Sequence, residues 1–144
     1  MSNFKGKMVR TCNHIGLFAS DPEGLIAFYS EKIGFEKGEK RSIPAEVTQQ
    51  IFGIKSRCSL TKLVYGSVVL EVFSLEDTKL EEKPTASKGY NHWGLAVNER
   101  ESFIAALEDN DVPVIRIESR GRCVFFIRDP EDNLVEIFEA RSLK

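Results

Sequence analysis

The chain has 144 residues, of which 42% are hydrophobic and 29% are charged, so it can bury a core as one domain without disulfide bonds. Its formal net charge of −2 provides no basic field for nucleic acid or for an anionic membrane surface. The three cysteines show no CxxC spacing, the N-terminus has no apolar leader, and no apolar run approaches about 20 residues. These features favour a reduced, cytoplasmic protein that does not bind membranes.

The first predicted element is a strand in the phrase NHIGLFAS. Its alternation places His14, Gly16 and Phe18 on one face and the aliphatic residues between them on the other. The apolar spacing of residues 20–34 then predicts an amphipathic helix that ends at Gly34. The chain therefore begins with a strand followed by a helix.

Two strand-like runs, CSLTKLVYG and SVVLEVFSL, complete the first half of the chain. The segment before them contains PAEVTQQIF, which predicts a short extra helix that ends at Gly53. In the second run, Glu71 stands among apolar residues and shares a face with Phe73. Because an unpaired carboxylate in such a setting costs several kcal/mol, we expect Glu71 to have a partner.

The second half repeats this order after a polar linker at residues 74–90. The phrase NHWGLAVN predicts a strand that carries His92 at the position of the first histidine, and a second amphipathic helix follows it. The runs VIRIES, RCVFFIRD and NLVEIFEA then predict three strands. The last of these places Glu136 beside Phe138 at the position of the first glutamate. The order predicts one α+β domain, residues 1–144, with modules at residues 10–75 and 90–140.

Four side chains thus occupy equivalent positions in the two predicted modules: His14, Glu71, His92 and Glu136. A single histidine or glutamate in a strand is more often a structural or surface residue than a metal ligand. The duplication favours a functional role, because a pseudo-twofold pairing of the modules brings all four side chains to one cleft. Two imidazoles and two carboxylates suit Zn, Ni, Co, Mn or Fe and leave positions open for water or substrate. We therefore expect a divalent metal ion here.

The chain resembles the vicinal oxygen chelate superfamily, also called the glyoxalase/bleomycin-resistance/dioxygenase family. The resemblance rests on NHIGLFASDPEGLIAFYSEKIGF, VVLEVF, NHWGLAV and FFIRDPEDNLVEIFE, which together span nearly the whole chain. It implies two βαβββ modules that form a curved eight-stranded mixed sheet around a metal cleft. It also implies metal ligands at His14, Glu71, His92 and Glu136. The implied partners are a small-molecule substrate and a second copy of the chain in a homodimer, and the sequence leaves open whether the modules close within one chain or across the dimer.

Within this family, the four-ligand set is most similar to that of lactoylglutathione lyase. This resemblance implies a metal-dependent lyase or isomerase that transfers a proton through a metal-bound enediolate. Either Glu136 or Glu71 can serve as the base, and the resemblance favours Glu136. Ring-cleaving dioxygenases of the family use a His-His-Glu set with a further histidine, and this chain has only two histidines.

Two alternatives to the lyase remain open. A CoA-thioester epimerase of the methylmalonyl-CoA epimerase type has a similar site but usually carries Gln at the position of Glu71. A metal-free binding or resistance protein is disfavoured, because a full ligand set serves no purpose in it. The stretch SLEDTKLEE replaces an Asn-bearing stretch of lactoylglutathione lyases, so glutathione is not favoured over other adducts.

An arginine cluster lies in the phrase RIESRGRCVFFIR near the end of the chain. It contains Arg116, Arg120, Arg122 and Arg128. Such a cluster can bind a carboxylate or a CoA phosphate. A solvated hairpin explains the same pattern and is the favoured interpretation.

Overall fold

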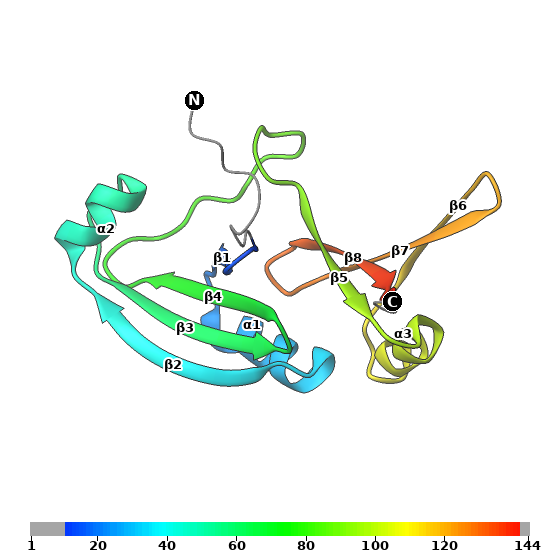
Figure 1. The fold of residues 1–144 in the computed structure, drawn as a ribbon. Coiled ribbons are helices and arrows are strands. Elements are labelled where there is room, and N and C mark those ends of the chain that lie inside the picture. Colours follow the sequence, from blue (N-terminus) through cyan, green and yellow to red (C-terminus); the bar gives the residue numbers. More distant parts are fainter. Residues whose placement is uncertain (1–10, 142–144) are drawn as a thin grey trace, which may run out of the picture.

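The computed structural model describes residues 11–141 and divides their strands between two mixed sheets (Figure 1). The first sheet contains, in spatial order, β1 (Ile15–Phe18), β4 (Val68–Leu75), β3 (Cys58–Tyr65) and β2 (Glu36–Ile43). The second contains β5 (His92–Val97), β8 (Leu134–Glu139), β7 (Arg122–Arg128) and β6 (Ile115–Ser119). In each sheet the first and last strands of the module pair in parallel, and the other neighbours are antiparallel.

The helices give each module the order βαβββ. They are α1 (Pro22–Ala27), its continuation as the π-helical segment η1 (Phe28–Ile33), α2 (Ala45–Phe52) and α3 (Arg100–Asp109). The expected α+β fold of two βαβββ modules is confirmed. Its eight strands form two four-stranded sheets rather than one continuous sheet, because β1 and β5 stand at sheet edges and do not pair with each other. Among residues 11–141, no helix is long and apolar enough to cross a membrane.

The connection between β2 and β3 makes the first module longer than the second. It contains α2, the predicted extra helix, which ends at Gly53 with a φ of 72°. The equivalent strands β6 and β7 are joined by a tight turn in which Arg120 and Gly121 have φ values of 52° and 73°. The predicted βαβββ order requires the strand β2, but no residues were assigned to it, because all but its last residue are exposed and it shows no apolar alternation.

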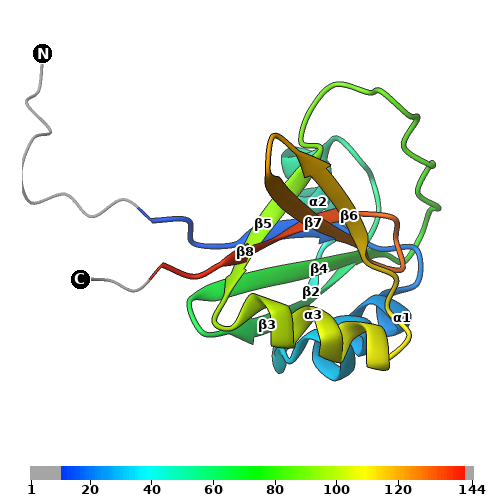
Figure 2. The ribbon, with the colours of Figure 1, turned by 90° about the vertical axis from the view of Figure 1, so that its right-hand side faces the viewer.

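A single hydrophobic core contains side chains from both modules. Leu70 and Val72 of β4 and Val135 and Ile137 of β8 are buried in it. Figure 2 shows α1 and α3 along the same side of the molecule, where their apolar residues contribute to this core. Because side chains alternate along a strand, the residue between each buried pair lies on the opposite face of its sheet. These intervening residues are the two predicted ligand glutamates.

A buried hydrogen bond joins the helix of the first module to the second module. The Tyr29 hydroxyl donates to the Asp129 carboxylate at 2.7 Å, and both residues are buried. The carboxylate also accepts from the backbone N–H groups of Glu131 and Asn133, which fixes the turn between β7 and β8. Burial, together with the nearby Asp129 carboxylate, raises the pKa of Tyr29 well above its ordinary value. The tyrosine therefore stays neutral and acts as a donor.

Two further hydrogen bonds cross between the modules near this contact. The Asp21 backbone N–H donates to the Glu131 carboxylate at 2.8 Å. The Lys32 ammonium donates to the Asn110 carbonyl at 2.6 Å. Together with the shared core, these contacts hold α1 and η1 against the second module.

We expect the substitution Tyr29→Phe to destabilise the fold by about 1–3 kcal/mol, because it removes the hydroxyl donor to the buried Asp129 carboxylate and leaves only the Asn133 side-chain amide as a donor to that oxygen. Urea unfolding monitored by circular dichroism measures this change. Tyr65→Phe is the matched control, because the Tyr65 side chain is partly exposed and should tolerate the loss of its hydroxyl. Equal unfolding free energies for the two variants would contradict the importance of this hydrogen bond.

Candidate metal centre

The first predicted pair of ligands meets on the face of the first sheet that is turned away from the core. His14 directly precedes β1, and the parallel pairing of β1 with β4 places Gly16 opposite Glu71. The His14 Nε2 atom lies 3.3 Å from Glu71 Oε1. The histidine side chain is 45% exposed and the glutamate side chain only 10%. We call His14 and Glu71 half-site 1.

The second pair repeats this arrangement in the second sheet. His92 is the first residue of β5, and Gly94 lies opposite Glu136 of β8. The His92 Nε2 atom lies 3.3 Å from Glu136 Oε2. The exposed fractions of the two side chains are 38% and 17%. We call His92 and Glu136 half-site 2.

An asparagine orients each histidine, and the sequence interpretation missed this role. The His14 ring nitrogen Nδ1 lies 2.9 Å from Asn13 Oδ1, and His92 Nδ1 pairs in the same way with Asn91 Oδ1. Because an amide oxygen can only accept a hydrogen bond, Nδ1 carries the hydrogen in both rings. The Nε2 atoms are thereby directed toward the glutamates. The signal was present in the sequence, since both histidines follow an asparagine.

The strands β1 and β5 each also carry a glycine that makes room for an aromatic ring. A Cβ atom added at Gly16 would lie 3.3 Å from the Phe73 ring, and one added at Gly94 would lie 3.1 Å from the Phe138 ring. The absence of a side chain lets each ring lie against the strand beside its half-site. In the first module, Phe52 of α2 packs against Phe73 with ring centroids 5.4 Å apart. Half-site 1 therefore has an aromatic wall.

The two half-sites do not meet within one chain. Among residues 11–141, no group of three or more histidine, cysteine, aspartate or glutamate side chains is close enough to hold a metal ion. Both sheets turn one face toward the shared core, and each half-site lies on the other face of its own sheet. The chain by itself thus presents the predicted ligands as two separate pairs.

The chain matches the Glyoxalase/Bleomycin resistance protein/Dioxygenase superfamily over residues 11–137. It belongs to this superfamily. Among individual proteins, it is 24% identical over 135 residues to the uncharacterized protein YwkD of Bacillus subtilis (strain 168), covering 92% of this chain and 98% of YwkD.

Solved structures of the superfamily share its fold. A glyoxalase family protein from Enterococcus faecalis has a TM-score of 0.70 at 24% identity, covering 90% of this chain and 98% of that one. The trypanothione-dependent glyoxalase I of Leishmania major has a TM-score of 0.68 at 23% identity, covering 91% and 87%. A lactoylglutathione lyase from Agrobacterium tumefaciens has a TM-score of 0.62 at 22% identity, covering 93% and 96%.

Divalent metals are common in this superfamily, and the donor atoms of each half-site fit such an ion. Nitrogen and oxygen ligands at about 2.0–2.2 Å from a metal lie about 3 Å from each other. The separation of 3.3 Å between imidazole nitrogen and carboxylate oxygen is close to this value in both half-sites. Glu71 as a whole residue is only 8% exposed. Among residues 11–141, His14 is its one basic partner within 4.0 Å. A cation near His14 and Glu71 would compensate the burial of this carboxylate.

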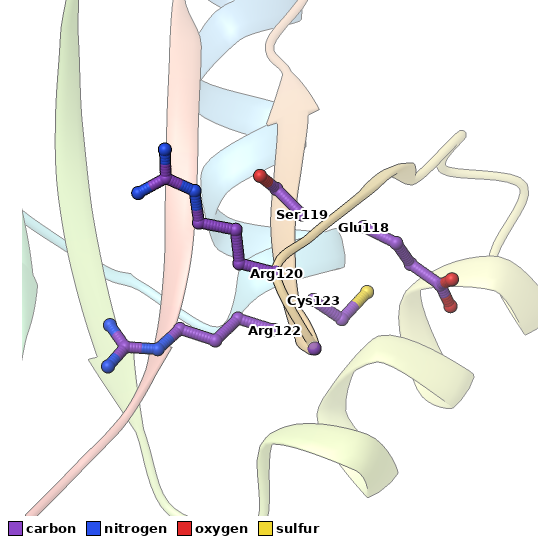
Figure 3. Close-up of a pocket in the computed structure, with 6 residues that line it drawn as sticks. Glu118, Ser119, Arg120, Arg122 and Cys123 are labelled. Carbon is purple, nitrogen blue, oxygen red and sulfur yellow. The ribbon is translucent and has the colours of Figure 1, made fainter.

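The predicted arginine cluster is divided between ion pairs and an open hairpin. Arg116 pairs with Glu108 of α3, and Arg128 pairs with Asp132 at 3.3 Å. Arg120 and Arg122 line a shallow pocket at the tip of the β6–β7 hairpin, and their side chains extend toward the same side (Figure 3). Two of the four guanidinium groups are thus already paired with carboxylates, which agrees with the solvated hairpin rather than a four-arginine anion site.

We expect Asn13→Ala and Asn91→Ala each to weaken Co²⁺ binding by about 10–100-fold, because each removes the acceptor that orients a predicted ligand histidine. Competition with a chelator of known affinity measures the change. Asn98→Ala is the control, since Asn98 follows β5 and is exposed. Unchanged Co²⁺ affinity in both variants would argue against the orienting role of the asparagines.

Proposed function

We propose that this protein is a metal-dependent lyase or isomerase of the lactoylglutathione lyase type. It would remove a proton from the carbon next to the carbonyl of a small hemithioacetal or thioester substrate and return it to the neighbouring carbon, or to the other face of the same carbon. The observation that supports this proposal is the duplicated histidine–glutamate pair, which repeats the same 3.3 Å contact in both modules. Four such ligands favour proton transfer over ring cleavage, since the chain has no third histidine.

In the proposed active site, half-site 1 of one chain faces half-site 2 of a second copy. A single chain leaves each pair with two protein donors, which is fewer than the three or four of a typical catalytic site. A twofold dimer would make two equivalent sites, one for each chain. The strand register also places exposed apolar side chains on the face that carries half-site 2. They are Ile115, Ile117 and Phe138, and a second copy would cover them.

The proposed roles of the four ligands follow from their surroundings. The imidazoles of His14 and His92, held by their asparagines, would bind the ion through Nε2. The ion, when bound, would supply Lewis-acid stabilisation of negative charge. We assign Glu136 as the base that takes and returns the substrate proton, because its side chain is more exposed than that of Glu71. The aromatic side chains beside the half-sites would exclude water from the reacting carbon.

Metal content tests the proposed site directly. After reconstitution, we expect about one Co²⁺ per chain in the wild-type protein, because a twofold dimer would contain two sites. The variants His14→Ala and Glu136→Ala should each lose most of this metal. Glu118→Gln, in the exposed β6–β7 hairpin, is the control and should keep it. Substoichiometric metal in the wild type, or full metal content in both His14→Ala and Glu136→Ala, would contradict the proposal and favour a metal-free binding protein.

Solvent exchange tests the proposed reaction. In D₂O, we expect deuterium at the carbon next to the thioester carbonyl, either in the product formed from the glutathione hemithioacetal of methylglyoxal or in methylmalonyl-CoA, detected by NMR. Incorporation from the hemithioacetal indicates the lyase, and incorporation into methylmalonyl-CoA indicates the epimerase. Glu136→Gln should slow exchange by about 10²-fold or more, because the amide cannot take the proton. The absence of exchange with both substrates would count against both reactions.

A further inference from the structure

Lys62 places a positive charge on the face of the sheet that carries half-site 1. In the antiparallel pairing of β3 with β4, Lys62 lies directly opposite Glu71. Side chains of directly opposite residues leave the sheet on the same face, with their Cβ atoms about 5 Å apart. His14 approaches Glu71 from β1, on the other side of β4. The glutamate is therefore flanked by the histidine and the lysine.

The ammonium group of Lys62 is not used in an ion pair. Among residues 11–141, no carboxylate lies within 4.0 Å of it. Its side chain is nevertheless half-buried. A lysine that buries its aliphatic stem while its charge stays unpaired can bind an anion from outside the chain.

The neighbouring strand has a glycine beside the stem of this lysine. A Cβ atom added at Gly38 of β2 would lie 3.6 Å from both Cβ and Cγ of Lys62 and 3.3 Å from its carbonyl oxygen. Gly38 reaches this place because the pairing of β2 with β3 is irregular between Lys37 and Lys40. The glycine therefore leaves room for the Lys62 stem beside β2.

The second module differs from the first at this position. Phe126 lies opposite Glu136 in the same way that Lys62 lies opposite Glu71. Its ring centroid is 5.7 Å from that of His92. Half-site 2 thus keeps the 3.3 Å contact between His92 and Glu136, although a phenylalanine stands where half-site 1 has the lysine. A cation is therefore not needed to position the ligand pair, and the charge of Lys62 calls for another explanation.

We infer that Lys62 binds a carboxylate of the substrate and makes the proposed active site selective for acidic substrates over neutral ones. This inference rests on the proposed function, because it places the substrate at half-site 1. A charged hydrogen bond between ammonium and carboxylate is stronger in a cleft with aromatic walls than in water. Lys62 is thus a specificity-determining residue that is distinct from the four ligands.

Two hydroxamates of equal length test this selectivity on the Co²⁺-loaded protein. Succinohydroxamate ends in a carboxylate, whereas butyrohydroxamate ends in a methyl group. By isothermal titration calorimetry, we expect the wild type to bind succinohydroxamate about tenfold more tightly. Lys62→Met should abolish this preference and leave the affinity for butyrohydroxamate unchanged. Lys62→Arg keeps the positive charge and should retain most of the preference.

Lys37→Met is the matched control, because Lys37 lies opposite Leu63 and thus on the other face of the sheet. It should change neither affinity. Co²⁺ content and circular dichroism establish that each variant is folded and loaded. A wild type without preference, or a Lys62→Met variant that keeps it, would overturn the role of Lys62. If the wild type binds no Co²⁺, or binds neither hydroxamate, the proposed function itself fails, and the inference falls with it.

Discussion

The buried hydrogen bond between Tyr29 and Asp129 joins the two modules together with their shared core. It attaches the helical segment of the first module to the β7–β8 turn of the second, and both sheets then contribute to one core. Each half-site is left on the face of its sheet that is turned away from this core. The separation of the ligand pairs is therefore a consequence of how the modules pack, and it is the reason that we place the complete site between two chains.

The features that the sequence predicts well are those that depend on neighbouring residues. Alternation along the strands predicted that His14 shares a face with Phe18 and that Glu71 shares a face with Phe73. The same alternation placed the core residues on the other face of each strand. The extra helix α2 was predicted together with its end at Gly53, where a positive φ favours glycine. The duplicated phrases identified two βαβββ modules, because each copy combines a strand pattern and a helix pattern in the same order.

The features that the sequence did not predict depend on residues that lie far apart in the chain. The strand β2 has almost no buried side chain, so only its pairing with β3 identifies it. Lys62 became noticeable only when the register of β3 placed it opposite Glu71. The separation of the half-sites depends on contacts such as that between Tyr29 and Asp129, which are 100 positions apart. The role of Asn13 is the exception, since it lies beside its histidine and the repetition was visible.

The duplication also explains how one chain can build an asymmetric site from similar parts. Both modules provide an imidazole and a carboxylate in the same geometry, but their surroundings differ. Half-site 1 has α2 and Lys62 beside it, whereas half-site 2 has Phe126 and the exposed apolar residues of β6. If the two half-sites of different chains face each other, the substrate would meet a charged wall on one side and an apolar wall on the other. Such a cleft could orient a small acidic substrate without a large binding surface.

The most direct measurement of the central claim is the Co²⁺ content of mixed dimers. One chain carries His14→Ala with Glu71→Ala, and the other carries His92→Ala with Glu136→Ala. Each variant alone lacks a complete site. Refolded together in equal amounts, they should bind about a quarter of the wild-type Co²⁺, because about half of the dimers are mixed and each mixed dimer has one intact site. A mixture that binds no more Co²⁺ than the two variants measured separately would contradict a site shared between chains.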